Sequence, residues 1–85
     1  VALCGGAGAF LLDEAIRLEA DAFLTGEMSY HQFFGHEQEI QLAVMGHYQS
    51  EQYTREIFYQ LISDLAPELP LFITNVDTNP VHYLI

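Results

Sequence analysis

His47 and Glu51 are the two residues whose types and spacing best suit chemistry. They stand four positions apart at the start of an expected helix, so their side chains lie on one face and can reach a common ion. Imidazole nitrogen and carboxylate oxygen suit zinc, iron, manganese or nickel, and a carboxylate can also bridge two ions. The alternative is a hydrogen bond between a surface histidine and a glutamate. A metal needs at least three protein ligands, and the sequence shows only these two.

Glu27 and His31 are the candidate catalytic residues. Histidine titrates near neutral pH, so His31 can serve as a general acid or base or as a substrate contact. The alternative interpretation of His31 is a histidine on the surface of a helix, without a role in chemistry. Glu27 has three interpretations: a general base, the hydrogen-bonding partner of a ligand histidine, or an exposed carboxylate.

A glycine-rich loop, Gly5-Gly6-Ala7-Gly8, precedes an expected helix. A helix N-terminus can hold an anion, but the loop matches neither the dinucleotide nor the Walker pattern. A tight turn that allows close backbone packing explains it equally well. Cys4 is interpreted as an inert core thiol, His36 as a solvated loop residue and His82 as structural.

Alternating short apolar runs and amphipathic stretches predict the elements that position these residues. The expected strands cover residues 1–4, 22–25, 40–45 and 71–76, with a last edge strand at 81–85. The expected helices cover residues 9–20, 29–34 and 48–65. This order predicts an α/β fold, a mostly parallel sheet with helices packed on it.

Glycines follow the first three expected strands, and the candidate residues lie beside them: Gly5 to Gly8, Gly26-Glu27 and Gly46-His47. Open parallel sheets bind ligands beyond the carboxyl ends of their strands. The sequence therefore predicts one shared crevice at this edge of the sheet.

Charge and composition exclude several classes of function. The net charge is −10, and Arg17 and Arg55 are the only lysine or arginine residues. Binding to nucleic acid or to an anionic membrane needs clustered cations, so we expect neither partner. The longest apolar run, residues 1–12, is too short to span a bilayer. A single cysteine suits a reducing compartment, and we expect a cytoplasmic protein.

The length of 85 residues allows one domain and no more. A domain this small is marginally stable by itself, so we expect it to lean on another domain or chain. We expect residues 1–85 to form a single α/β domain, the C-terminal fragment of a longer chain.

Four stretches together resemble the NGG-interacting-factor-three-like proteins, often called GTP cyclohydrolase type I homologues. They are Cys4 to Gly8, Thr25-Gly26-Glu27 with Tyr30-His31, Gly46 to Glu51, and Asn75 to Pro80. They occur in the family's order over nearly the whole chain, and the third stretch is the most specific.

The resemblance implies two α/β lobes around a dinuclear metal site and assembly into homo-oligomeric, ring-like hexamers. It implies that His47 and Glu51 are metal ligands and that Glu51 bridges the two ions. The remaining ligands, a His-His pair and an Asp, would come from an N-terminal lobe that these residues do not include. His31 matches a family histidine that faces the same cleft.

Two functions follow as hypotheses. The first is a metal-dependent hydrolase acting on a nucleotide or phosphoester, in which divalent ions activate water and Glu27 or His31 moves protons. The alternative is a non-catalytic metal-binding oligomeric scaffold or regulatory partner-binding protein, whose acidic surface would face a basic partner.

Overall fold

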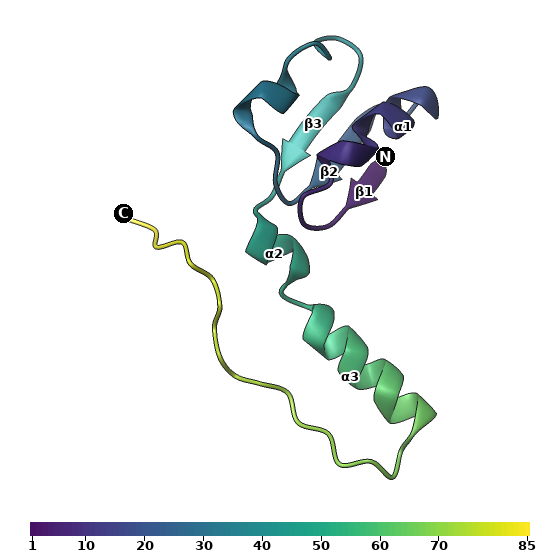
Figure 1. Cartoon of the computed structure of the whole chain (residues 1–85), viewed down its shortest axis with the longest axis vertical. Helices are drawn as coiled ribbons and strands as arrows, with labels where there is room; N and C mark the ends of the chain where they lie inside the picture. The colour runs from purple at the N-terminus through teal and green to yellow at the C-terminus, as the bar shows by residue number, and fades with distance from the viewer. The chain divides into compact units, whose positions relative to one another are not determined.

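The computed structural model describes all 85 residues. Its contacts divide the chain into two units, Val1–Glu51 and Gln52–Ile85 (Figure 1). That residues 1–85 form one domain of a longer chain stays a prediction. No helix has both the length and the apolar character needed to cross a membrane.

The first unit contains a sheet of three parallel strands, β1 (Ala2–Cys4), β2 (Ala22–Thr25) and β3 (Gln41–Val44), in the order β1-β2-β3. Across the sheet, Leu3 pairs with Leu24, and Leu24 with Ala43. Each strand is short and mainly apolar, and a glycine follows within two residues of its end, as expected for strands of a parallel sheet. The structure confirms the α/β fold class and the first three predicted strands.

A short helical segment follows β1 and returns the chain to the sheet. It begins as the 3-10 turn η1 (Ala9–Leu11) and continues as α1 (Leu12–Arg17). The expected helix to residue 20 ends at Arg17 because Glu19 takes a left-handed φ of 60°. The amide of Ala20 then donates to Ala15 O and that of Glu19 to Ile16 O, which is the Schellman pattern of a helix end.

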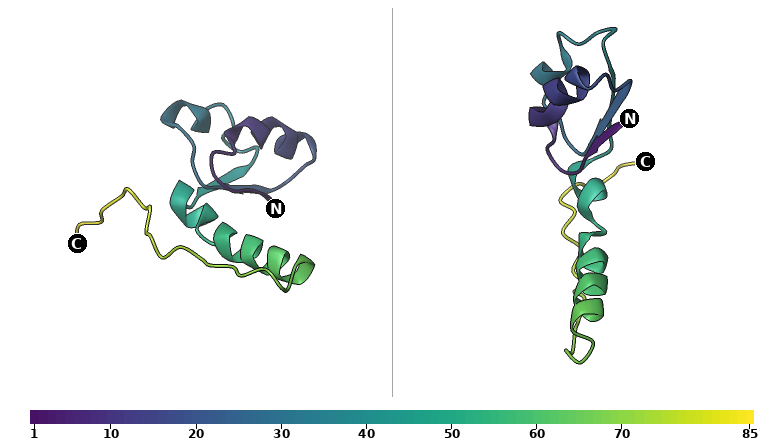
Figure 2. Two further views of the ribbon diagram at one scale, coloured as in Figure 1. Left: turned by 60° about the horizontal axis from the view of Figure 1, so that its bottom comes forward. Right: turned by 90° about the vertical axis from the view of Figure 1, so that its right-hand side faces the viewer.

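The small core of this unit lies between α1 and the sheet. Leu12 and Ala15 of α1 pack with Phe23 of β2, and all three are buried. Ala2 and Leu42 from the outer strands pack around them. Helix α1 therefore covers one face of the sheet, as Figure 2 shows.

The crossover between β2 and β3 carries a second short turn, η2 (Tyr30–Phe33), within the expected helical range 29–34. The Ser29 amide donates to Gln32 Oε1 over 2.8 Å at its start. Gly35, with a φ of 91°, stands just after its end. In Figure 2, η2 lies on the same face of the sheet as α1.

The helix expected over residues 48–65 is wrong as one element, since it forms two: α2 (His47–Glu51) and α3 (Thr54–Leu65). The Ser50 hydroxyl donates to His47 O over 2.8 Å. Such back-bonding to the preceding turn bends helices, and α2 ends one residue later, at Glu51. A new helix start follows, where Tyr53 O accepts the amides of Glu56 and Ile57.

The second unit holds α3 and a segment without regular secondary structure. The strands expected at 71–76 and 81–85 do not form, so both predictions are wrong. A strand needs a neighbour to pair with, and local side-chain bonds serve here instead. Thr74 Oγ1 accepts the Val76 amide over 3.2 Å, and Asn79 Oδ1 accepts the Val81 amide over 3.1 Å.

Candidate functional site

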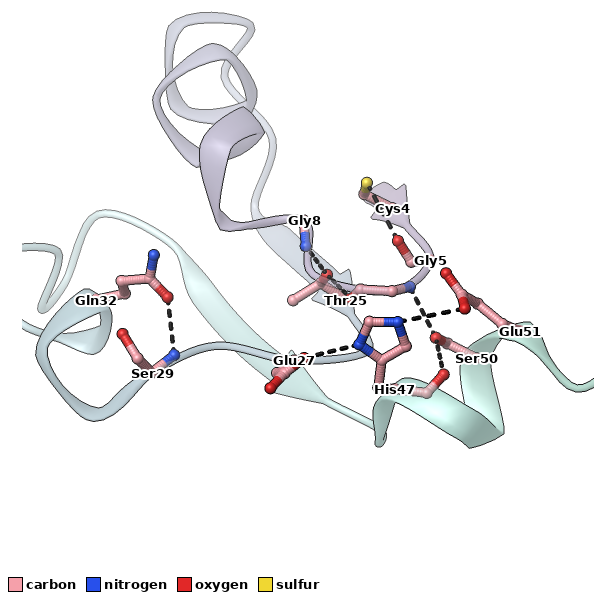
Figure 3. Close-up of polar contacts among 11 residues, drawn as sticks. Cys4, Gly5, Gly8, Thr25, Glu27, Ser29, Gln32, His47, Ser50 and Glu51 are labelled. Atoms are coloured by element: carbon pink, nitrogen blue, oxygen red, sulfur yellow. Dashed lines mark hydrogen bonds and ion pairs between the residues drawn. The ribbon is translucent and has the colours of Figure 1, made fainter. Parts of the chain in front are cut away.

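The imidazole of His47 lies between two carboxylates at the carboxyl edge of the sheet (Figure 3). Its Nδ1 is 2.7 Å from Glu27 Oε2, and its Nε2 is 3.3 Å from Glu51 Oε2. Glu27 follows β2, whereas His47 and Glu51 begin and end α2. Residues 20 positions apart thus meet because β2 and β3 are neighbours and end at one edge.

The three side chains of this cluster are about half exposed, with fractions of 60% for Glu27, 49% for His47 and 53% for Glu51. The hydrogen bond to Glu27 raises the pKa of His47, and the charge of Glu51 adds to this, while partial loss of water opposes it. The neighbouring carboxylates therefore favour a protonated imidazole when no cation is present.

The backbone of Gly6 forms one wall of the cluster. Gly6 is buried and has a φ of 67°, a backbone conformation that residues other than glycine rarely adopt. A Cβ added here would collide with Glu51 Oε1 and lie 3.4 Å from His47 Nε2. The glycine-rich loop therefore leaves room for the His47–Glu51 pair.

Two hydroxyls that the sequence did not mark hold this loop. Thr25, fully buried at the end of β2, accepts the Gly8 amide over 2.9 Å and donates to Gly6 O over 3.0 Å. Ser50 Oγ accepts the Gly6 amide over 2.8 Å. The sequence offered two local signals for these roles: Thr25 stands at the end of a strand, and Ser50 lies on the same helix as His47.

The structure does not bring His31 into contact with the cluster. His31 lies on η2 with its ring edge-to-face against Tyr30, at 5.2 Å between centroids. His36 stands in the following loop, 3.6 Å from Glu39. With 22% of its side chain exposed and its Nδ1 buried, His36 is not the solvated residue that the sequence suggested. The role assigned to His31 stays a prediction.

An open hollow of about 350 Å³ lies beside Glu27. It is lined by Ala7, Ala9, Phe10, Glu27, Met28, Ser29 and Gln32.

The nitrogen and oxygen donors of His47 and Glu51 are suited to form part of a metal site. Glu27 accepts a hydrogen bond from Nδ1 of His47, an arrangement that fixes the tautomer and orients a ligand histidine with Nε2 available. Glu51 lies beside that nitrogen, and Gly6 leaves space in front of both. No group of three or more His, Cys, Asp or Glu side chains here is arranged to hold a metal, so a bound ion would need further ligands.

Comparisons with known proteins agree with this fold. A Campylobacter jejuni protein named GTP cyclohydrolase 1 type 2 homolog is 35% identical over 85 residues, covering 98% of this chain and 32% of its own length. The crystal structure of Staphylococcus aureus protein SA1388 is similar in fold, with a TM-score of 0.72 at 19% identity, over 96% of this chain and 28% of that one. The chain thus spans about a third of the length of these relatives.

The family comparison covers almost the whole sequence, including every residue of the His47 cluster. The model of the family described as Duf34/NIF3 (NGG1p interacting factor 3) matches residues 1–80. The chain belongs to the DUF34/NIF3 family.

Proposed function

We propose that these residues supply part of a dinuclear metal site in a metal-dependent hydrolase-like protein. The observation that carries the proposal is the His47 imidazole held between Glu27 and Glu51. Such an arrangement orients one ring nitrogen by hydrogen bonding and presents the other beside a carboxylate. The remaining ligands would come from outside these 85 residues.

Each residue of the cluster has a distinct part in the proposal. His47 would bind through Nε2, and Glu51 would bind through its carboxylate and bridge the two ions. Glu27 keeps the proton on Nδ1, which favours the second of its three interpretations, partner of a ligand histidine, over a general base. When bound, divalent zinc, iron, manganese or nickel would lower the pKa of water and polarise a substrate oxygen.

A nucleotide or phosphoester is the substrate class we propose, in a cytoplasmic homo-oligomer that is hexameric at natural length. Support for a nucleotide comes from the name of the Campylobacter jejuni relative, GTP cyclohydrolase 1 type 2 homolog. His31 remains the candidate proton carrier, although its ring contacts Tyr30 rather than His47.

Elemental analysis of the protein at its natural length tests the metal proposal. About two ions per chain are expected, as in two-metal hydrolases, with loss in both His47→Ala and Glu51→Ala. His36→Ala is the matched control, since this histidine lies in a loop outside the cluster and should leave metal content unchanged. Full metal retention in the His47 and Glu51 variants would overturn the ligand assignment.

Turnover and assembly separate the hydrolase from the scaffold. If the protein is an enzyme, Glu27→Ala and His31→Ala should lower hydrolysis of nucleotides or phosphoesters while the oligomer, measured by light scattering, persists. A protein that binds metal, assembles and is indifferent to His31→Ala in every function measured would favour the scaffold or partner-binding alternative.

A further inference from the structure

Ser50 connects the glycine-rich loop to the helix that carries His47 and Glu51. Its Oγ accepts the amide of Gly6 over 2.8 Å, from 44 positions away in the sequence. The same hydroxyl donates to His47 O over 2.8 Å. Both hydrogen-bonding roles of one hydroxyl thus link the wall of the cluster to the residue that begins α2 (Figure 3).

The surroundings of Ser50 leave its hydroxyl little freedom. A Cβ added at Gly26 would collide with Ser50 Oγ and would lie 2.8 Å from Gly6 O and 3.0 Å from Gly46 O. Gly26 is buried, and its amide donates to Gly6 O over 2.9 Å. The bare α-carbon of Gly26 therefore allows three segments, at residues 6, 46 and 50, to approach one another.

We propose that Ser50 is a positioning residue that sets the distance between the Gly6 backbone and the His47–Glu51 pair. It touches neither substrate nor metal in this proposal, and it acts through the two ligands. The inference rests on the proposed metal function and names a residue that maintains its geometry.

The position of Gly6 explains why this distance matters. The glycine α-carbon faces Glu51 Oε1 and His47 Nε2 so closely that even a methyl group there would collide with the carboxylate. Removal of the Ser50 hydroxyl leaves the Gly6 amide without its partner, while Gly6 O keeps its bonds to Thr25 and Gly26. The side of the Gly6 backbone that faces α2 can then shift toward or away from the ligands. Either shift changes the space in which Nε2 and the carboxylate meet an ion, and ligand geometry of this kind governs affinity.

The test compares Ser50→Ala with Ser63→Ala in the protein at its natural length. Ser63 is also a helical serine, but it lies on α3 and makes none of these hydrogen bonds. Zn²⁺ affinity is measured by competition with a chromophoric chelator, and Co²⁺ absorption reports the ligand geometry. We expect Ser50→Ala to weaken Zn²⁺ binding by about tenfold or more and to change the Co²⁺ spectrum, as loss of outer-shell partners does. Ser63→Ala should match the wild type.

Thermal unfolding of the metal-free variants separates positioning from folding. The proposal expects Ser50→Ala to remain folded at the temperature of the titration. Unchanged Zn²⁺ affinity and Co²⁺ spectrum in a folded Ser50→Ala protein would overturn the inference alone. A Ser50→Ala protein that fails to fold would also overturn it, because Ser50 would then be needed for the fold itself. If the wild type binds neither metal, the proposed function fails first, and the inference fails with it.

Discussion

At the scale of single residues, the two nitrogens of His47 face different carboxylates. Nδ1 is 2.7 Å from Glu27, and this short hydrogen bond fixes the orientation of the ring. Nε2 is 3.3 Å from Glu51, and this longer contact is the one that a bound ion would replace. The helical spacing of His47 and Glu51 accounts for one contact, and the neighbouring strand ends account for the other.

Substitution of Glu27 by Gln should lower the pKa of His47 in the metal-free protein. The hydrogen bond to Glu27 is the main cause of the raised pKa, and a neutral amide cannot stabilise the imidazolium in the same way. NMR titration of the imidazole protons measures this change. Glu39→Gln is the matched control, because that carboxylate faces His36 instead. An unchanged His47 pKa in Glu27→Gln would contradict the contact.

The same shift has a defined sign for stability. The pKa of His47 is higher in the folded chain than its ordinary value, so folding favours the protonated ring. Its stabilising contribution is fully present below the unfolded pKa and is lost as the pH rises through the raised folded pKa. With these side chains half exposed, solvent screening keeps the contribution small.

The Thr25 hydroxyl should matter more for stability than its size suggests. It is fully buried and serves both the Gly8 amide and Gly6 O, so Thr25→Val leaves the buried Gly8 amide without its partner. We expect the free energy of unfolding to fall by about 1–3 kcal/mol, measured by urea denaturation. Thr25→Ser keeps the hydroxyl and should lose less. A Thr25→Val protein as stable as the wild type would show that the hydroxyl does not stabilise the fold.

At the scale of elements, the first unit depends on the contact between α1 and β2. Helix α1 spans only Leu12–Arg17, too short to be stable by itself, and it is held by the burial of one face on Phe23. The exposed ion pair between Glu14 and Arg17 contributes little in comparison.

Leu12→Ala should therefore destabilise the protein far more than Leu18→Ala. Leu12 is 4% exposed within the core, whereas Leu18 is 64% exposed just after the helix. We expect a loss of about 2–5 kcal/mol for Leu12→Ala, since a buried leucine leaves a cavity, and a loss within about 0.5 kcal/mol for Leu18→Ala. Chemical denaturation of both variants checks the difference, and similar losses would show that α1 does not cover the core.

At the scale of the whole molecule, the two units differ in their packing. The first unit has a parallel sheet with buried side chains, whereas Ile57, Phe58 and Leu61 on α3 are exposed in the second. Residues 71–85 form no strand. Apolar side chains of α3 are therefore exposed, whereas those on one face of α1 are buried.

Amide hydrogen exchange of the isolated 85-residue chain should reproduce this contrast. Amides of β2 lie in the centre of the sheet and should exchange slowly, while those of residues 71–85 lack ladder hydrogen bonds and should exchange quickly. Mass spectrometry of exchanged peptides gives the comparison. Slow exchange over 71–76 would indicate a strand that this structure does not contain.

Local sequence patterns were sufficient for most of the first unit. Short apolar runs closed by glycine predicted β1, β2 and β3, and the alternation with helices predicted a parallel α/β sheet, which the structure confirms. The spacing of His47 and Glu51 predicted their contact, because a helix brings side chains four positions apart onto one face.

Only the tertiary structure decided what depends on distant partners. The predicted strand at 71–76 does not form because a strand is stabilised by its neighbour rather than by its own residues. The helix expected to begin at residue 48 forms as α2 and α3, with an interruption at residues 52–53. The contacts of Thr25 and Ser50 with Gly6 join residues 19 and 44 positions apart. The periodicity of a helix or strand relates only residues close in the sequence, so it cannot predict such pairs. Hydrogen bonds of this kind exist only once the strands have brought three loops to one edge.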